Sequence, residues 1–415
     1  MNIKDKLRQL DRTSPAPQKP VAPQATGVEA LAAQLGGEIM NTGHGPWIHV
    51  VRQLPLQTRH GPMPLDRIFA IENAILRLIA KNQISERYDL RQALFIDTET
   101  TGLAGGAGTY VFLIGAGYVQ GEHFVVEQMF LPQLGAEAAM LAHFETLLSA
   151  HQGLVSFNGK SYDVPLLTNR FIQQRMSPFV GMHEHLDLLH IARRLFANDF
   201  GDCSLGTLER QVLQVQRNGD IPGAEIPRIY MDYLRYGEAD LLPAVLYHNR
   251  MDIVSMVALV IHLVEMARLA QQPNAEPVQA ARVAKLHMAV RAPQRAAHIF
   301  ENILSSPTLR GDEEIEFLLH YARTQKKLRQ YPLALQAWQQ IIEKNTFCLE
   351  PFVELAKFHE HQDKDFARAL QYTERALRAV ETKLQLASTR ALLQDHKALL
   401  HRRNRLLQKL RRLKK

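Results

Sequence analysis

The feature that most constrains the fold is a change of hydrophobic periodicity along the chain. Between about residues 91 and 269, short apolar runs typical of buried strands alternate with stretches in which apolar residues recur at helical spacing. From about residue 277 onward, helical spacing alone is found. Because strands that alternate with helices pack as a sheet covered by helices, this division predicts an α/β domain followed by an all-α region.

The α/β block is expected to contain a sheet that is not purely parallel. We expect strands at residues 93–97, 110–119, 123–130 and 153–157, and helices at residues 137–150 and 163–175. Gly121 lies where a hairpin turn would join the second strand to the third. Ahead of this block, residues 1–27 are rich in proline and predict a disordered tail. Residues 28–90 predict a strand, at 47–55, and a helix, at 68–79, that pack on the sheet domain.

The helical region contains an internal repeat. Residues 331–342 align with residues 366–377 at an offset of 35, and residues 295–304 form a weaker copy at an offset of 38. Tetratricopeptide repeats have a period of about 34 residues. Residues 277–381 therefore predict tetratricopeptide-like repeats that offer a surface to a protein partner, and an irregular helical bundle is the alternative.

Composition excludes several classes of protein. The 415 residues include only two cysteines, Cys203 and Cys348, which rules out a disulfide scaffold and a cysteine-rich zinc module and suits a reducing cytoplasm. The longest apolar stretch, residues 253–264, is too short to cross a bilayer, so we expect a cytoplasmic protein without a membrane segment. Residues 382–415 carry eleven Lys and Arg against one acid, which predicts a basic C-terminal helix that attracts nucleic acid.

A buried strand leads directly into Asp97 and Glu99. Residues two apart in a strand point to the same face, so the two carboxylates are expected side by side. Burying both is costly unless cations neutralise them, and hard oxygen ligands favour Mg²⁺ or Mn²⁺ over zinc. The alternative is a strand that ends in solvent, where both acids are merely hydrated. The turn Thr100-Thr101-Gly102 favours the first interpretation, because its hydroxyls, amides and glycine permit close approach of a substrate backbone.

Two further acids lie in predicted helices. Asp163 falls in a first helical turn, where an acid also offsets the helix dipole. Asp252 follows His248 by four residues, so the two are neighbours on one helical face, whereas Tyr247 points elsewhere. An ordinary capped helix with a satisfied histidine is the alternative there. The stretch ending at Asp187 also contains two histidines, and we interpret it as a strand end whose aspartate caps the next helix.

Taken together, the three acidic segments resemble the three motifs of the DEDD 3′–5′ exonucleases, in the same order. The run from Asp97 to Gly102 is similar to the opening motif of that superfamily. The runs Phe157-Asn-Gly159 and Tyr162-Asp-Val-Pro165 resemble the second motif as it occurs in the exonuclease domain of B-family DNA polymerases. The wider segment is similar to the YprB-type bacterial RNase H-like family, whose members often carry tetratricopeptide repeats. We therefore place an RNase H-like exonuclease domain at residues 91–271.

The resemblance implies a ligand set for two divalent cations, Mg²⁺ or Mn²⁺, made of Asp97, Glu99, Asp163 and Asp252. It also implies that Asp97 bridges both ions, that Leu103 packs against the terminal base and that Asn158 faces the substrate strand. The other expected substrate contacts are Thr100, Thr101, Gly102 and Lys160. No nucleotide cofactor is expected, because the glycine-rich residues 102–108 have neither Rossmann nor Walker spacing.

The third motif departs from the family pattern. Related exonucleases place a tyrosine four residues before the last acid or a histidine five before it, whereas this chain has His248 at four and Tyr247 at five. Helical geometry favours His248 as the general base, with Tyr247 as the second choice. We expect a metal-dependent 3′–5′ exonuclease that acts on single-stranded DNA or RNA ends, with an endonuclease of the same fold as a close variant. The alternative is a non-catalytic adaptor that binds nucleic acid and recruits a partner through its repeats.

Overall fold

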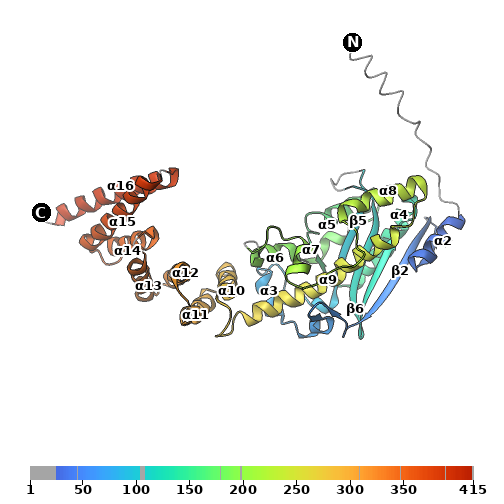
Figure 1. The fold of residues 1–415 in the computed structure, drawn as a ribbon, viewed down its shortest axis with the longest axis horizontal. Helices are drawn as coiled ribbons and strands as arrows, with labels where there is room; N and C mark the ends of the chain where they lie inside the picture. The colour runs from blue at the N-terminus through green and yellow to red at the C-terminus, as the bar shows by residue number, and fades with distance from the viewer. Residues whose placement is uncertain are drawn as a thin grey trace, which may run out of the picture. The chain divides into compact units, whose positions relative to one another are not determined.

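The structure is a computed structural model that describes residues 25–43, 45–102, 108–177, 179–196, 199–307, 309–345, 347–387 and 389–413 (Figure 1). The chain divides into two units, one ending at Val264 and the other beginning at Glu265. Every strand of the described residues belongs to the first unit, and the described residues of the second contain helices only. The predicted α/β domain followed by an all-α region is confirmed.

A seven-stranded mixed sheet forms the centre of the first unit. In spatial order its strands are β1 (Glu38–Thr42), β2 (Gly45–Pro55), β7 (His123–Phe130), β6 (Val111–Gln120), β5 (Ala93–Thr100), β8 (Gly153–Ser156) and β9 (Glu184–Asp187). The pairs from β1 to β5 are antiparallel, whereas β5–β8 and β8–β9 are parallel. Gly121, at φ +59°, turns the chain between β6 and β7 as expected for a hairpin. A separate ribbon pairs β3 (Arg59–His60) with β4 (Met63–Pro64).

Helices connect and cover these strands. They are α2 (Ala25–Leu35), α3 (Asn73–Ile79), α4 (Glu137–Ala150), α5 (Asp163–Gln173), α6 (Leu188–Phe196), α7 (Leu205–Gln211), α8 (Ile226–Tyr236) and α9 (Leu242–Leu269). Short 3₁₀ turns are η1 (Leu65–Ala70), η2 (Leu90–Gln92), η3 (Leu134–Ala136), η4 (Phe179–Met182) and η5 (Gly223–Glu225). Because α2 begins at Ala25, the last residues of the expected tail are helical, and residues 1–24 lie outside the described residues.

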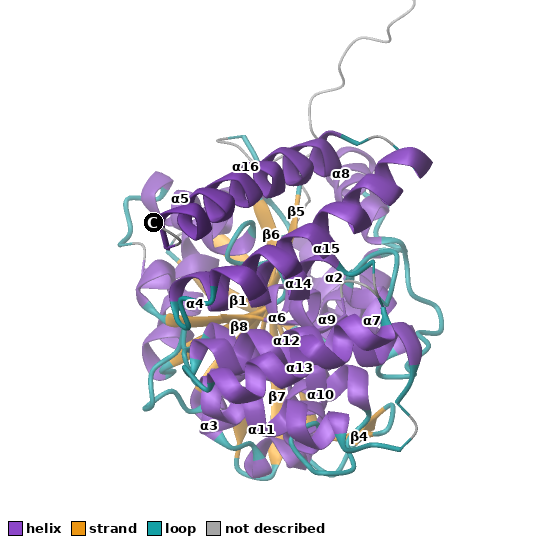
Figure 2. Ribbon diagram, turned by 90° about the vertical axis from the view of Figure 1, so that its left-hand side faces the viewer, coloured by secondary structure: helices purple, strands orange, loops and turns teal. Residues whose placement is uncertain are grey.

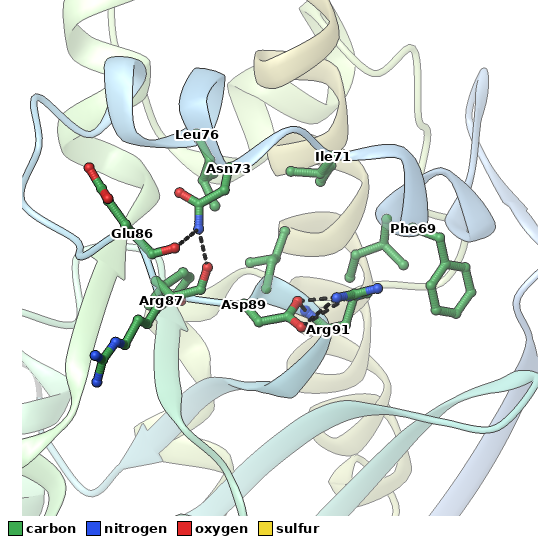
Figure 3. Close-up of a pocket in the computed structure, with 11 residues that line it drawn as sticks. Phe69, Ile71, Asn73, Leu76, Glu86, Arg87, Asp89 and Arg91 are labelled. Atoms are coloured by element: carbon green, nitrogen blue, oxygen red, sulfur yellow. Dashed lines mark hydrogen bonds and ion pairs between the residues drawn. The ribbon is translucent and has the colours of Figure 1, made fainter.

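The helix expected at residues 68–79 is divided in two. Most of its apolar residues belong to η1 and to α3, but Ile71, like Glu72, is extended between them. The side chain of Asn73 donates hydrogen bonds to the carbonyl oxygens of Glu86 and Tyr88 (Figure 3). These bonds anchor the start of α3 to the returning chain, so the backbone turns here although the apolar spacing is helical across the break.

The burial of β5 explains why its acids lie at the edge of the core. Residues 93–96 are each at most 1% exposed, because β5 lies between two other strands and both of its faces are covered. From Asp97 onward burial alternates: Thr98 and Thr100 are buried, whereas Asp97 and Glu99 are partly exposed. The strand therefore leaves the core with both acids on one face.

Two glycines in β6 make room for α9, which lies across the strands in Figure 1. A Cβ atom on Gly115 would stand 2.2 Å from Oδ1 of Asn249, and one on Gly117 would stand 2.4 Å from Cγ2 of Ile253. A side chain at either position would displace the helix. Asn249 is fully buried, so the close approach places a polar side chain of α9 directly on the sheet.

A buried ion pair holds α4 and α5 together. The guanidinium of Arg170 in α5 donates to both carboxylate oxygens of Glu137 in α4, at 2.6 and 2.5 Å, and both residues are at most 2% exposed. The same guanidinium lies 3.9 Å from the ring centroid of Tyr110, just before β6. The pair therefore supports the chain that returns from the acidic end of β5.

The second unit is a succession of helices in which each contacts the next. They are α10 (Pro277–Ala289), α11 (Pro293–Leu304), α12 (Gly311–Lys327), α13 (Tyr331–Lys344), α14 (Leu349–His361), α15 (Phe366–Leu386) and α16 (Arg390–Leu413). Three alanines at equivalent places of the sequence repeat, Ala296, Ala334 and Ala369, are all fully buried. Small side chains at these places let neighbouring helices pack closely, so the helical region fits the repeats seen in the sequence.

The basic C-terminal helix α16 packs against α15 and is not a solvated arm (Figure 2). Leu399 and Leu406 are buried at 4% and 0% exposure. The fully buried carboxylate of Glu360 in α14 accepts hydrogen bonds from three α16 cations, Arg402, Arg405 and Lys409, at 2.7 to 2.9 Å. Part of the positive charge of α16 is therefore used inside the protein.

Helices long and apolar enough for a bilayer crossing are not found in the described part of the chain.

Candidate metal centre and nucleic-acid site

Asp97 and Glu99 stand at the end of β5 on the face that α9 covers. Asp97 pairs with Gly115 and Glu99 with Leu113 of the antiparallel β6, and the register shifts between Glu99 and Thr100. Asn249 of α9 donates to the Asp97 carboxylate at 2.8 Å, which places that carboxylate under the helix. The strand ladder thus fixes both backbones, and α9 fixes the direction of Asp97.

Asp163 is the first residue of α5 and is 5% exposed. The hydroxyl of Thr98, from the opposite face of β5, donates to its Oδ1 at 2.5 Å. A Cβ atom on Gly159 would stand 2.4 Å from the Ser156 hydroxyl and 3.3 Å from the Asp163 carboxylate, so the turn before α5 fits tightly under this acid. The hydrogen bond and the tight turn together hold the second acidic segment at the end of β5.

The four predicted acids act on one another electrostatically. The pKa of Asp97 is raised well above its usual value, first by burial and then by the charges of Asp252, Glu99 and Asp163. The pKa of Glu99 is raised by burial and by Asp252, Asp163 and Asp220. Burial also raises the pKa of Asp163 to about 6, although the hydrogen bond from Thr98 opposes this. Segments more than 150 residues apart in the chain therefore converge here.

The carboxylates are neighbours without forming a closed ligand set. Among the described residues, no three of these acids bring one carboxylate oxygen each to within 4.8 Å of one another. Unpaired carboxylates repel, and Asp252 is engaged by a cation of the protein. The guanidinium of Arg217 binds Asp252 and the buried Glu209, and it lies 3.0 Å from Asp220.

Arg217 lies in the chain between α7 and η5, and its side chain is 9% exposed. Burial alone would lower the pKa of its guanidinium, but the charges of Asp252 and Glu209 raise the pKa above the usual range. Ser255 of α9 donates to Glu209 and contacts Nε2 of His60 at 2.7 Å, which extends the network into the core. Arg217 therefore sets the direction of Asp252.

His248 and Tyr247 point to different places. Nδ1 of His248 lies 3.0 Å from Oδ1 of Asp220, and its Nε2 lies 3.7 Å from Oδ2 of Asp252. The guanidinium of Arg250 lies 5.6 Å from the ring centroid of Tyr247. His248 thus faces the last acid of the group, as the four-residue spacing predicts.

The predicted substrate turn is tied to the second motif. The hydroxyl of Tyr162 donates to the carbonyl oxygen of Gly102 at 2.9 Å and also lies 2.9 Å from the hydroxyl of Thr100. The hydroxyl of Thr101 accepts from the Tyr110 amide at 3.0 Å. Both threonine hydroxyls therefore brace the turn from within, and their contact with a substrate stays a prediction. Leu103 lies outside the described residues.

Asp187 organises the loop that carries Asn158 and Lys160. Its carboxylate accepts the Leu189 amide at 3.1 Å, which caps α6 as expected. It also accepts the backbone amides of Asn158, at 2.9 Å, and Lys160, at 3.1 Å. Asn158 is exposed with a left-handed φ of +70°, and Lys160 is half-buried. Burial lowers the pKa of the Lys160 ammonium, and Asp187 opposes this.

Sequence reasoning missed Asn249, Arg217 and Asp220. Asn249 donates to Asp97 and accepts from Gln128 of β7 at 2.8 Å, so it joins the first and third acidic segments through the sheet. The two strand glycines of β6 were a signal that a helix approaches closely there. For Arg217 and Asp220 no periodicity exists, because they lie in an irregular connection whose path depends on the rest of the fold.

A pocket of about 340 Å³ between η1, α3 and the chain before β5 is separate from these residues (Figure 3). The predicted site residues are absent from its described lining.

Comparison with known proteins agrees with this architecture. The profile of the RNase_H superfamily matches residues 94–264, the segment that contains all four acids. Over 328 residues the chain is 32% identical to the uncharacterized protein YprB of Bacillus subtilis (strain 168). This aligned segment covers 78% of each of the two chains. With its RNase H superfamily domain followed by a helical region, the chain belongs to the YprB family.

Proposed function

We propose that the protein is a two-metal-ion nuclease, specifically a 3′–5′ exonuclease that hydrolyses phosphodiester bonds at single-stranded DNA or RNA ends. The observation that carries this proposal is that the acidic segments meet at the end of β5. Asn249 of α9, three residues before Asp252, bonds to Asp97, and Thr98, between Asp97 and Glu99, bonds to Asp163. The charges of the other three acids accordingly raise the pKa of Asp97. Groups kept together against such repulsion are a mark of functional sites, because they cost stability unless a cation binds between them.

The donor chemistry of the site fits hard divalent cations. Asp97, Glu99, Asp163 and Asp252 offer carboxylate oxygens, the ligands that Mg²⁺ and Mn²⁺ prefer. In this proposal these four residues hold two such ions, and Asp97, at the centre of the group, contacts both. When bound, the ions supply a water of lowered pKa and stabilise the negative charge of the leaving oxygen.

Within this proposal the chain's own residues position the reacting groups. Asn249 keeps the Asp97 carboxylate turned toward the site through its 2.8 Å hydrogen bond. Thr98 holds the Asp163 carboxylate at the end of β5 by a second hydrogen bond. Because both donors are fixed by strand and helix, little reorganisation is needed when substrate arrives.

His248 is the general base in this proposal. Its Nδ1 is held by Asp220, which leaves Nε2 directed toward Asp252. A histidine whose one nitrogen is anchored by a carboxylate presents the other in a defined tautomer and direction, which general-base catalysis needs. Tyr247 remains the second choice, and its neighbour Arg250 gives it no comparable anchor to an acid.

The substrate strand is proposed to follow the loop after β8 and the turn after β5. Asn158 is exposed in the loop after β8, and Lys160 follows two residues later. The turn Thr100–Gly102 and Leu103 would meet the terminal nucleotide. A basic side chain beside an exposed amide suits a phosphate backbone in either DNA or RNA.

A non-catalytic adaptor is the second candidate, and the ion pair between Arg217 and Asp252 favours it. A guanidinium bound to the last acid competes with a cation for the same oxygens. In the adaptor, the RNase H-like domain would bind nucleic acid, and the helical repeats of the second unit would bind a protein partner.

The deciding experiment is degradation of end-labelled single-stranded DNA and RNA with Mg²⁺, Mn²⁺ or EDTA, using free and blocked 3′ ends. The nuclease predicts metal-dependent ladders from free 3′ ends that vanish in Asp97→Asn. Asp240→Asn is the matched control, because this exposed aspartate has no place in the site. If wild type and Asp97→Asn are equally inactive on both substrates with both metals, the adaptor is the remaining function. Cleavage of blocked substrates would identify an endonuclease.

A further inference from the structure

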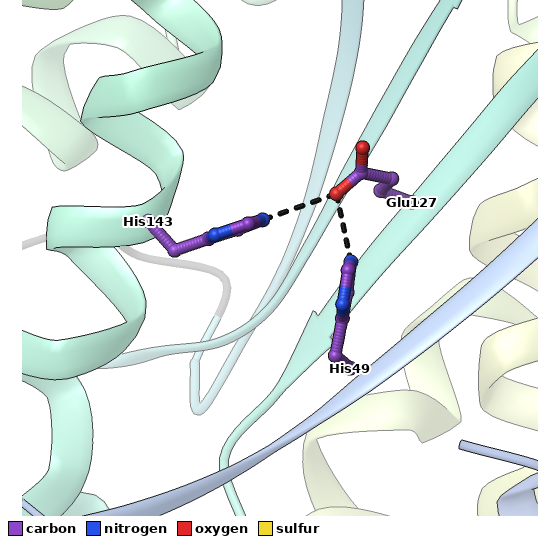
Figure 4. A group of neighbouring side chains, drawn as sticks. All are labelled: His49, Glu127 and His143. Atoms are coloured by element: carbon purple, nitrogen blue, oxygen red, sulfur yellow. Dashed lines mark hydrogen bonds and ion pairs between the residues drawn. The ribbon is translucent and has the colours of Figure 1, made fainter. Parts of the chain in front are cut away.

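A second cluster of potential metal ligands lies on the opposite face of the sheet from α9 (Figure 4). His49 of β2 and Glu127 of β7 meet His143 of α4, with His49 Nε2 at 2.7 Å and His143 Nε2 at 3.0 Å from the same carboxylate oxygen. Successive strand residues point to opposite faces, and Gln128, next to Glu127, bonds to Asn249 of α9. The cluster is therefore separate from Asp97 and Glu99, which lie on the face that α9 covers.

The three side chains are held in place by their surroundings. The ring of Trp47 packs against His49 and His143 at centroid distances of 5.3 and 4.9 Å, and the two imidazoles lie 4.9 Å apart. The hydroxyl of Tyr118 donates to the second oxygen of Glu127 at 2.5 Å. Such a hydrogen bond from a neighbouring residue fixes a carboxylate ligand and leaves its other oxygen directed at the imidazoles.

The tautomer of the two imidazoles decides what the cluster can do. With a proton on Nε2, each ring donates a hydrogen bond to the shared carboxylate oxygen. With the proton on Nδ1 instead, each ring turns an Nε2 lone pair toward the carboxylate, and that lone pair can bind a metal. The side-chain exposures of His49, Glu127 and His143 are 17%, 9% and 27%, so an ion can reach the cluster from solvent.

We propose that His49, Glu127 and His143 bind one transition-metal dication of the Zn²⁺ class. Two imidazole nitrogens and one carboxylate oxygen are a common ligand set for Zn²⁺, which leaves a fourth position for water. Mg²⁺ and Ca²⁺ should bind weakly to these three residues, because both ions prefer oxygen ligands alone. The proposal is independent of the nuclease function.

The geometry requires only a small adjustment. Zn²⁺ ligands at about 2.0–2.2 Å in a tetrahedron lie roughly 3.3 Å from one another. The two nitrogen–oxygen distances, 2.7 and 3.0 Å, would each open by roughly half an ångström or less. The three donor atoms already lie within 4.8 Å of one another.

The ion would join the N-terminal part of the chain to the RNase H-like domain. His49 precedes residues 94–264, whereas Glu127 and His143 lie within them. Strand β2 and helix α4 would then be cross-linked to strand β7, which pairs with β2 in the sheet. Zn²⁺ bound to the folded state alone raises its stability by mass action, so the melting temperature should increase with Zn²⁺ concentration.

The test titrates Zn²⁺ and Co²⁺ into the intact chain in excess Mg²⁺, which occupies carboxylate sites. We expect one equivalent of Zn²⁺ by isothermal calorimetry, and with Co²⁺ the visible absorption bands of a tetrahedral imidazole complex. His49→Gln, His143→Gln and Glu127→Gln should each abolish this complex. Tyr118→Phe, which removes the hydrogen bond to Glu127, should weaken binding about 10–100-fold. His262→Gln, at a half-buried histidine of α9, is the matched control and should bind as wild type.

Tryptophan fluorescence of the wild-type protein tests the proposal even if the variants fail to fold. Co²⁺ at the cluster would lie beside the Trp47 ring and quench its fluorescence, with saturation at one equivalent. Absence of Zn²⁺ binding in wild type, unquenched Trp47, or folded glutamine variants that bind Zn²⁺ as tightly as wild type would each overturn the proposal.

Discussion

Replacing Gly115 with alanine tests whether close packing of α9 on the sheet sets the first acid of the site. The new methyl group would stand 2.2 Å from Oδ1 of Asn249 and 2.5 Å from Cδ1 of Ile253, far inside van der Waals contact. Neither neighbour can yield easily: Asn249 is fully buried and bonded to Asp97 and Gln128, and Ile253 is fully buried in α9.

The expected loss of stability follows from overpacking. Inserting a methyl group into a well-packed core costs about 1–3 kcal/mol. For a unit of this size that corresponds to a melting temperature roughly 3–9 °C lower. The displaced Asn249 would also release the Asp97 carboxylate, and loss of such a supporting hydrogen bond typically reduces metal affinity or activity about 10–100-fold.

The assay compares thermal melting, Mn²⁺ affinity and nuclease rate of Gly115→Ala with those of Gly135→Ala. Gly135 lies in η3 with no atom near the site of a Cβ, so its alanine variant should melt as wild type or slightly higher. The reasoning is refuted if Gly115→Ala melts within about 1 °C of wild type. A strongly destabilised variant with unchanged Mn²⁺ affinity would show that Asn249 packs α9 without directing Asp97.

Three further predictions follow from the site and from α16. In the metal-free protein, ionisation of Asp163 should lower the stability by about 3 kcal/mol as pH rises from about 4 to about 7. Folding raises the pKa of this carboxyl to about 6 from an ordinary value near 3.9, so the unfolded chain loses the proton first. Millimolar Mn²⁺ should therefore raise the melting temperature more at about pH 8 than at about pH 5, and equal increases would contradict this sign. Arg217→Met should lower the free energy of unfolding, measured in urea, by about 3–5 kcal/mol, because buried Glu209 loses its cation. Adding Glu209→Gln should recover much of this loss, whereas additive losses would argue against the ion pair. Replacing the exposed Lys397, Arg411 and Arg412 by glutamine should lower the salt slope of single-strand binding by about 2 and spare turnover at saturation, whereas an unchanged slope would place the phosphate contacts elsewhere.

The local elements near the acids were predictable from sequence. The apolar run before Asp97 gave β5, and the helix expected at residues 137–150 is α4 with the same limits. The four-residue spacing placed His248 beside Asp252. These relations hold within one strand or one helix, where backbone geometry alone fixes which side chains are neighbours.

The charge of the C-terminal segment was visible in the sequence, but its partners were not. The basic residues predicted a C-terminal helix, yet nothing in the sequence indicated that Glu360, more than 40 residues earlier, accepts three of its cations. A buried acid in a helix has no signature of its own, because its burial is decided by the helix that packs over it.

The sequence by itself determined the strands and helices that carry the acids, and it placed two acids on one strand face and two in helices. Only the tertiary structure decided that Asn249 bonds to Asp97 across 152 residues, that Arg217 binds Asp252, and that His49 meets Glu127 across 78 residues. The physical reason is that periodicity is set by the short-range geometry of the backbone. Contacts between distant segments depend instead on the register of the sheet and on how closely each helix approaches it.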